Sequence, residues 1–228
     1  MALISTLKLL PFIMISVAIS VLLASCGEFD ESVFKSNGVY DSKAKKTVFL
    51  PQGKSPDGFL PASVSPSLYT KSSGLSKDKH GMPTYKSDNT RHRVVRTTAY
   101  SHMEMEVGAP WKKNAVGTYL KYGQVRSAAA DWSRYPVGTK FKIKGLPHTY
   151  IVDDYGSALV GTNTVDIYNP TLRTMRRWGT RRAEITVIQW GSLERTLNIL
   201  HARRGHKHCR KMYYAAKVRL DQKAVASN

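Results

Sequence analysis

The chain has 228 residues, 42% of them hydrophobic, with 35 Lys and Arg against 16 Asp and Glu. This length allows one ordinary domain with extensions or two very small ones. The formal net charge of +19 favours a polyanionic partner, but charge alone does not choose between nucleic acid, anionic lipid and an acidic polymer.

The first 25 residues are typical of an export signal. Lys8 is the only charge, an apolar run extends over residues 9–23, and small residues lead to Cys26. The sequence Leu-Ala-Ser-Cys resembles the lipobox of bacterial lipoproteins, which implies cleavage before Cys26 and a lipid anchor on it. An uncleaved transmembrane anchor is the alternative. Gly27, rather than Asp, after the cysteine favours the outer membrane, facing the periplasm, and export argues against a nucleic-acid partner.

Residues 26–90 are predicted to be a flexible tether that begins at the lipidated cysteine. The segment is rich in Ser, Lys, Gly and Pro, and its short apolar patches never establish a long period. Such composition rarely buries enough surface to offset the entropy of ordering. The alternative is a loose arm whose apolar patches pack on the following domain.

Residues 91–191 are predicted to be a small mainly β domain. β-branched and aromatic residues alternate with turn signals, and the expected strands are 93–100, 125–130, 140–144, 149–153, 164–168 and 183–190. One short helix interrupts them, with Asn169 as its cap, Pro170 in its first turn and Gly179 at its end. Six short strands in about a hundred residues favour a closed barrel over a sandwich.

Residues 192–228 are predicted to be a basic, partly helical tail. Leu193, Leu197 and Leu200 follow helical spacing, and residues 201–210 are strongly basic. The spacing of His206, His208 and Cys209 does not match a zinc site, so a solvated tail without metal is expected. With Cys26 lipidated, no intrachain disulfide is expected.

Three aspartates have unusual neighbours: Asp131, Asp154 and Asp166. Asp is a poor strand residue, yet Asp166 lies between Val165 and Ile167 in an apparently buried strand. If those neighbours face the core, Asp166 faces the opposite side. A partly desolvated carboxyl there would have a raised pKa, as a general acid requires at neutral pH.

The ordered motifs of residues 96–190 resemble the 3D domain, named for three aspartates and found in membrane-bound lytic transglycosylases and stationary-phase survival proteins. The motifs that carry this resemblance are Thr98-Ala99-Tyr100, Gly117 to Gly123, Ala130-Asp131 with Tyr135 to Thr139, Asp154 to Gly161, Asp166-Ile167-Tyr168 and Trp178-Gly179. The resemblance implies a six-stranded double-psi β-barrel. It also implies cleavage of the β-1,4 bond between N-acetylmuramic acid and N-acetylglucosamine in peptidoglycan without water, and no cofactor.

The resemblance assigns roles by position. Asp166 would act as acid and then base, and Asp154 would help to set its protonation. Asp131 would fix loops or the sugar. Apart from the resemblance, Trp111, Trp132 and Trp178 are candidates to stack on a sugar, and the position of Trp132 between Asp131 and Ser133 favours it as an exposed platform. The remaining expected substrate contacts are Thr98, Tyr100, Lys121 and Gly156. His102 and Glu104 either rim the groove or are ordinary loop residues.

Two departures from the family pattern keep a second hypothesis open. Ser157 replaces a glycine and Val160 replaces the usual lysine, although the three aspartates are intact. The larger transglycosylases also have a second domain that this chain lacks. The alternative is therefore a non-catalytic barrel that binds peptidoglycan glycan strands.

Overall fold

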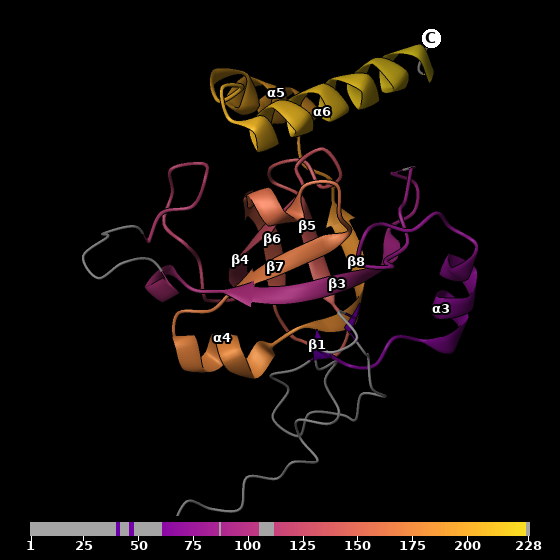
Figure 1. Ribbon diagram of the computed structural model, residues 1–228, viewed down its shortest axis with the longest axis vertical. Coiled ribbons are helices and arrows are strands. Elements are labelled where there is room, and N and C mark those ends of the chain that lie inside the picture. Colours follow the sequence, from indigo (N-terminus) through magenta and orange to yellow (C-terminus); the bar gives the residue numbers. More distant parts are fainter. Residues whose placement is uncertain (1–39, 42–45, 48–60, 87, 105–111, 227–228) are drawn as a thin grey trace, which may run out of the picture. The chain divides into compact units, whose positions relative to one another are not determined.

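The computed structural model describes residues 40–41, 46–47, 61–86, 88–104 and 112–226 (Figure 1). The expected signal segment 1–25 and the predicted lipidation site Cys26 lie outside these residues. Within the described part, no helix combines the length and apolar character that crossing a membrane requires. A two-residue antiparallel pair, β1 (Tyr40–Asp41) with β2 (Lys46–Thr47), precedes the main domain.

Six strands close into a barrel in the order β3-β7-β4-β6-β5-β8. Their bounds are β3 (His92–Tyr100), β4 (Val125–Ala130), β5 (Lys140–Ile143), β6 (Thr149–Asp154), β7 (Thr164–Tyr168) and β8 (Arg181–Gln189). The β3–β7 and β4–β6 pairs are parallel, and the other four pairs are antiparallel. The predicted mainly β, six-stranded closed barrel is confirmed.

Alternation along the strands decides which side chains fill the barrel. On β7, Val165 and Ile167 are buried in the core while Asp166 between them is partly exposed. On β4, Ala128 and Ala130 belong to the core and Ala129 points the other way. The core is completed by larger side chains, among them Val95, Phe141, Ile143, Tyr150, Val152, Ile185 and Val187. Each outward-facing residue therefore sits on a rigid wall.

The short helix α4 (Leu172–Trp178) begins two residues later than Asn169 and Pro170 predict. Thr171 is the cap, because its hydroxyl accepts a hydrogen bond from the Thr174 amide. Asn169 is buried instead, and its side-chain amide donates to the Ile167 carbonyl. The helix ends as predicted at Gly179, which has φ of 60°.

Residues 61–86 of the predicted tether form an arm that packs on the barrel, whereas the apolar patches at 48–50 and 59–60 lie outside the described residues. Helix α3 (Pro66–Ser73) contacts β3, and Met82 is fully buried. The Asp78 carboxylate accepts a hydrogen bond from the Asn163 amide, and the Tyr85 hydroxyl accepts one from the Val94 amide. A few buried contacts and backbone bonds thus order residues 61–86, although their composition lacks a periodic apolar pattern.

The C-terminal segment forms helices α5 (Leu193–Ala202) and α6 (Lys207–Ala226), which pack on each other. The expectation of a solvated tail around Cys209 is wrong. Cys209, Met212 and Ala216 are fully buried at helical spacing. Arg219, on the same face, donates to the carbonyls of Ser133 and Arg134. The many lysines and arginines of α6 conceal this narrow apolar face in the sequence.

Candidate active site

The two predicted catalytic aspartates lie on one outer face of the barrel. Ala129 on β4 is in register with Asp166 on one side and with Asp154 on the other. Residues in register on adjacent strands point to the same face. Two strand spacings put the Asp154 and Asp166 backbones about 10 Å apart. The small Ala129 side chain lies between them and is itself buried, with 5% of its surface exposed.

The Asp166 carboxyl is held by β3. Its Oδ1 accepts a 2.6 Å hydrogen bond from the Thr98 hydroxyl, and Thr98 is its register partner on that strand. Burial raises the Asp166 pKa from 3.8 to about 6. The Thr98 bond and the positive charge of Arg96 lower this pKa, whereas the negative charges of Glu104 and Asp154 raise it. The group therefore exchanges its proton near neutral pH.

The Asp154 carboxylate is more heavily hydrogen-bonded. Its Oδ2 accepts from the Tyr100 hydroxyl at 3.1 Å, and its Oδ1 accepts from the backbone amides of Ala115 and Tyr155 at 3.1 and 2.9 Å. Burial raises the pKa of Asp154 to about 6, although these three hydrogen bonds lower it. Burial also raises the Tyr100 pKa well above 10, so its hydroxyl remains a donor. Asp154 is thus fixed in position and has little freedom to reach a substrate.

Lys121 contacts Asp153, a residue that the motif reading passed over. The Lys121 ammonium lies 2.7 Å from Asp153 Oδ2, which also accepts from the Ser127 hydroxyl at 3.0 Å. Asp153 is buried, and burial raises its pKa while the Lys121 bond lowers it. The ion pair adjoins Asp154 in the chain, so Lys121 supports the site through Asp153. Opposite Ala128 and Ala129 of β4, strand β6 has one extra residue, Asp153, and this irregularity left no signal in the sequence.

Aromatic rings line the face beside the carboxyls. Tyr168, two residues after Asp166, has its ring centroid 5.6 Å from that of Tyr100 and 6.3 Å from that of Tyr122. The Tyr168 hydroxyl is 2.8 Å from Nδ1 of His102. Tyr168 is itself buried, with 4% of its surface exposed, so only the partly exposed Tyr100 and Tyr122 can offer an aromatic face to a sugar ring. His102 therefore lies at the rim of the site, and the negative charge of Glu104 raises the pKa of Asp166.

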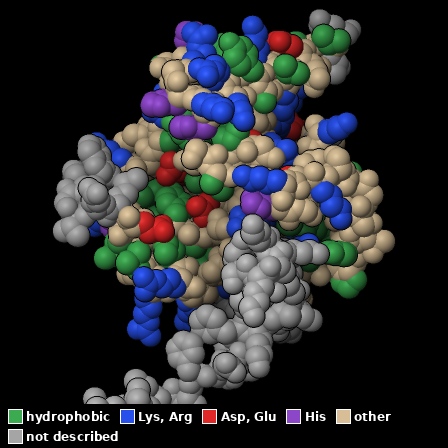
Figure 2. Space-filling model, in the orientation of Figure 1, with side chains coloured by type: hydrophobic (Ala, Val, Ile, Leu, Met, Phe, Trp, Pro, Cys, Tyr) green, Lys and Arg blue, Asp and Glu red, His purple; other side chains and the backbone are tan. Residues whose placement is uncertain are grey.

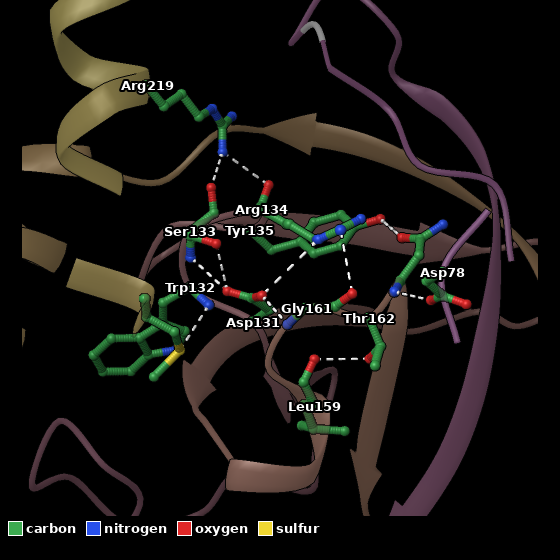
Figure 3. A network of polar contacts seen from close by, with 12 residues as sticks. Asp78, Asp131, Trp132, Ser133, Arg134, Tyr135, Leu159, Gly161, Thr162 and Arg219 are labelled. Atoms are coloured by element: carbon green, nitrogen blue, oxygen red, sulfur yellow. Dashed lines mark hydrogen bonds and ion pairs between the residues drawn. The ribbon is translucent and has the colours of Figure 1, made fainter. Parts of the chain in front are cut away.

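Asp131 is a structural residue, so the expected direct sugar contact is wrong (Figure 3). Only 2% of its surface is exposed. Its Oδ1 accepts from the amide and hydroxyl of Ser133, and its Oδ2 accepts a 2.6 Å bond from the Gly161 amide. Gly161 has φ of 78°, a conformation that favours glycine. Asp131 thereby ties the loop after β4 to the loop before β7, as its loop-fixing alternative supposes.

Trp132 is not an exposed platform. Its side chain is fully buried, edge-on to Tyr155 with ring centroids 4.9 Å apart. Its indole Nε1 donates a 2.8 Å bond to the carbonyl of Asp154. Its proximity to Asp131 in the chain suggested a loop-tip position, but α6 covers this region, with Met212 accepting a bond from the Trp132 amide. Trp132 therefore stabilises the end of β6 from the buried side.

We expect Trp132→Phe to lower the free energy of unfolding by about 1 kcal/mol, because the bond to the Asp154 carbonyl is lost. Affinity for glycan strands should not change, since the ring does not reach the surface. Denaturant unfolding and sedimentation with insoluble peptidoglycan measure the two effects. Weakened sedimentation with unchanged stability would contradict this assignment.

Gly156 begins the 3₁₀ turn η2 (Ser157–Leu159) with an extended backbone. A Cβ there would meet only the Leu159 side chain, at 3.6 Å. Gly156 lies two residues after Asp154, but its geometry shows no close approach that requires glycine. Among the residues that the structure describes, no group of three or more His, Cys, Asp or Glu side chains is arranged to hold a metal.

The site therefore brings together Thr98, Tyr100, Asp154 and Asp166, with Lys121 held nearby by Asp153. Figure 2 shows acidic side chains around a hollow lined by apolar side chains, on the face where β3 and β7 lie in front. One carboxyl with a pKa near 6, on a rigid wall, can both give and take a proton at neutral pH.

Comparison with known proteins agrees with this geometry. No curated protein matches the chain. The family model described as the 3D domain matches residues 126–190, a range that contains Asp131, Asp154 and Asp166. The match covers strands β4 to β8, while Thr98 and Tyr100 on β3 lie before it. Residues 126–190 therefore match the 3D domain.

Proposed function

We propose that this protein is a peptidoglycan lytic transglycosylase that cleaves the β-1,4 bond after N-acetylmuramic acid and leaves a 1,6-anhydro ring. The 3D domain is consistent with a barrel that acts on or binds peptidoglycan. The observation that carries the catalytic proposal is Asp166, a carboxyl with a pKa near 6 that Thr98 orients on an outer face of the barrel.

Asp166 serves both halves of the reaction. Protonated Asp166 gives its proton to the glycosidic oxygen as the C1–O bond breaks. The C6 hydroxyl of the same muramic residue then attacks C1, and the Asp166 carboxylate accepts the hydroxyl proton. The acid is restored and no water is consumed. Because the nucleophile belongs to the substrate, a single carboxyl suffices, unlike the pair that glycoside hydrolases require.

Asp154 acts as a positioning residue. Three hydrogen bonds hold it, so it does not approach the scissile bond. Its negative charge raises the pKa of Asp166 when both are ionised, which favours the protonated acid that starts the reaction. The Lys121–Asp153 pair and the Trp132 indole fix the end of β6 that carries Asp154.

We also propose that the chain is a lipoprotein anchored through Cys26 in the outer membrane, facing the periplasm. The lipobox-like sequence before Cys26 supports this, and so does the basic excess, which suits an anionic envelope. Growth with a clickable fatty acid should label the wild-type protein and should not label Cys26→Ser. Equal labelling of both would reject the anchor.

Digestion of purified sacculi by the full-length protein in detergent micelles tests the reaction. Mass spectrometry of the soluble products should show muropeptides with the 1,6-anhydro ring, which lack one water relative to hydrolysis products. Products that contain that water would indicate a hydrolase. Binding to sacculi without any product would favour the non-catalytic glycan-binding barrel, the alternative that the replacement of lysine by Val160 leaves open.

A further inference from the structure

A cavity whose walls include neither aspartate lies where the arm crosses the start of β3. Its volume is about 670 Å³, and residues of α3, of the segments 74–76, 84–86 and 89–91, and of β3 line it. Its three lysine and arginine side chains are Lys71, Lys86 and Arg91, and His92 lies beside them. No acidic side chain is present among the described residues of its wall. A cavity of this composition concentrates positive potential.

The cations of the cavity are available to a ligand. Lys71, Lys86 and Arg91 are all exposed, and within the described residues none of them forms an ion pair. Nη1 of Arg91 donates to the carbonyls of Val187 and Ile188 at 3.1 and 3.2 Å, which fixes its guanidinium. A guanidinium that is already ordered binds a carboxylate at a smaller entropic cost.

The rest of the wall is partly apolar. Leu68 and Leu75 contribute aliphatic surface, and Tyr85 is held in place by its bond to the Val94 amide. A smaller cavity of about 230 Å³ shares Leu68, Lys71 and His92 with the main one, so the groove continues along α3. Its one carboxylate, Glu184, is already bonded to Ser65 and Lys144. This shape suits an extended ligand with carboxylates and small apolar groups.

The groove and the site share a face of β3. His92 and Thr98 point to the same side of the strand and are six positions apart, a distance of about 20 Å. Val94 between them is buried, and its amide donates to the Tyr85 hydroxyl of the arm. A ligand in the groove is therefore separated from Asp166 along the strand by a distance that only an extended polymer spans.

We propose that this groove binds a short acidic peptide, the stem that peptidoglycan glycan strands carry. The assignment of the peptide to peptidoglycan rests on the proposed function. The three cations bind the stem carboxylates, and Leu68, Leu75 and Tyr85 contact its alanine methyl groups. The groove then selects strands that still carry peptides.

Titration calorimetry of the full-length protein in detergent micelles tests the groove, with the tripeptide L-Ala-γ-D-Glu-diaminopimelate as the probe. The Lys71→Gln/Lys86→Gln double variant should bind at least tenfold more weakly than the wild type. It leaves Arg91 and its bonds to the end of β8 in place, so the fold is spared. Lys142→Gln, which removes an exposed cation from β5, is the matched control and should bind like the wild type.

Three results would overturn the proposal: no binding by the wild type, equal binding by the double variant, or equal binding of the tripeptide with its carboxylates amidated. Inorganic phosphate that competes as strongly as the tripeptide would also overturn it, since the groove would then be a simple anion site. Asp166→Asn should keep the full affinity. If the protein binds the tripeptide but never cleaves sacculi, the groove proposal is kept and the proposed enzymatic function is rejected.

Discussion

Asp166→Asn is expected to release anhydro-muropeptides from sacculi at a rate about 10²–10⁴ times lower than the wild-type protein, the usual effect of losing a general acid and base. The asparagine side chain can still accept the Thr98 hydrogen bond, so the local geometry is kept while the exchangeable proton is lost. Quantitative mass spectrometry of the soluble products over time measures the rate.

Asp221→Asn is the matched control, because it removes an exposed carboxylate from α6 by the same substitution. Its rate should equal that of the wild type. In the wild type, the rate should also fall as the pH rises above about 6, because the fraction of protonated Asp166 falls tenfold for each further pH unit. An Asp166→Asn variant with the wild-type rate would assign the chemistry to another group.

The strands could be predicted from the sequence because period-two alternation and turn residues act locally. Strands 125–130 and 164–168 have the predicted bounds, and Asp166 faces outward as its two apolar neighbours indicate. The ordered motifs indicated the 3D domain, and the family model matches it over residues 126–190. Each of these inferences depends on residues close together in the chain.

The register of non-adjacent strands was not predictable in this way. That Ala129 separates the two carboxyls depends on the β4–β6 bulge and on the β4–β7 pairing, which are properties of the closed barrel. Trp132 was misplaced for the same reason, since its cover comes from α6, eighty residues later. The many basic residues of α6 hid its buried Cys209 and Met212 in the sequence.

The carboxyl that performs the proposed reaction also costs stability, and the sign of this cost can be derived from its pKa. In the unfolded chain Asp166 titrates near 3.8, and in the folded protein near 6. Below pH 3.8 the group is protonated in both states, so removing it does not change the free energy of unfolding. Between pH 3.8 and 6 the unfolded chain ionises first, so stability falls, and above pH 6 the full cost is present.

Asp166→Asn should therefore raise the free energy of unfolding by about 1–3 kcal/mol at pH 8 and by almost nothing at pH 4. Denaturant unfolding at the two pH values measures this difference, and Asp221→Asn should change it by less than about 0.5 kcal/mol at either pH. A variant that is less stable than the wild type at pH 8 would mean that Arg96 and Thr98 stabilise the carboxylate more than burial penalises it. A gain would instead show that the barrel retains an ionised carboxyl at a site where a neutral amide is more stable, as expected when the charge is needed for the reaction.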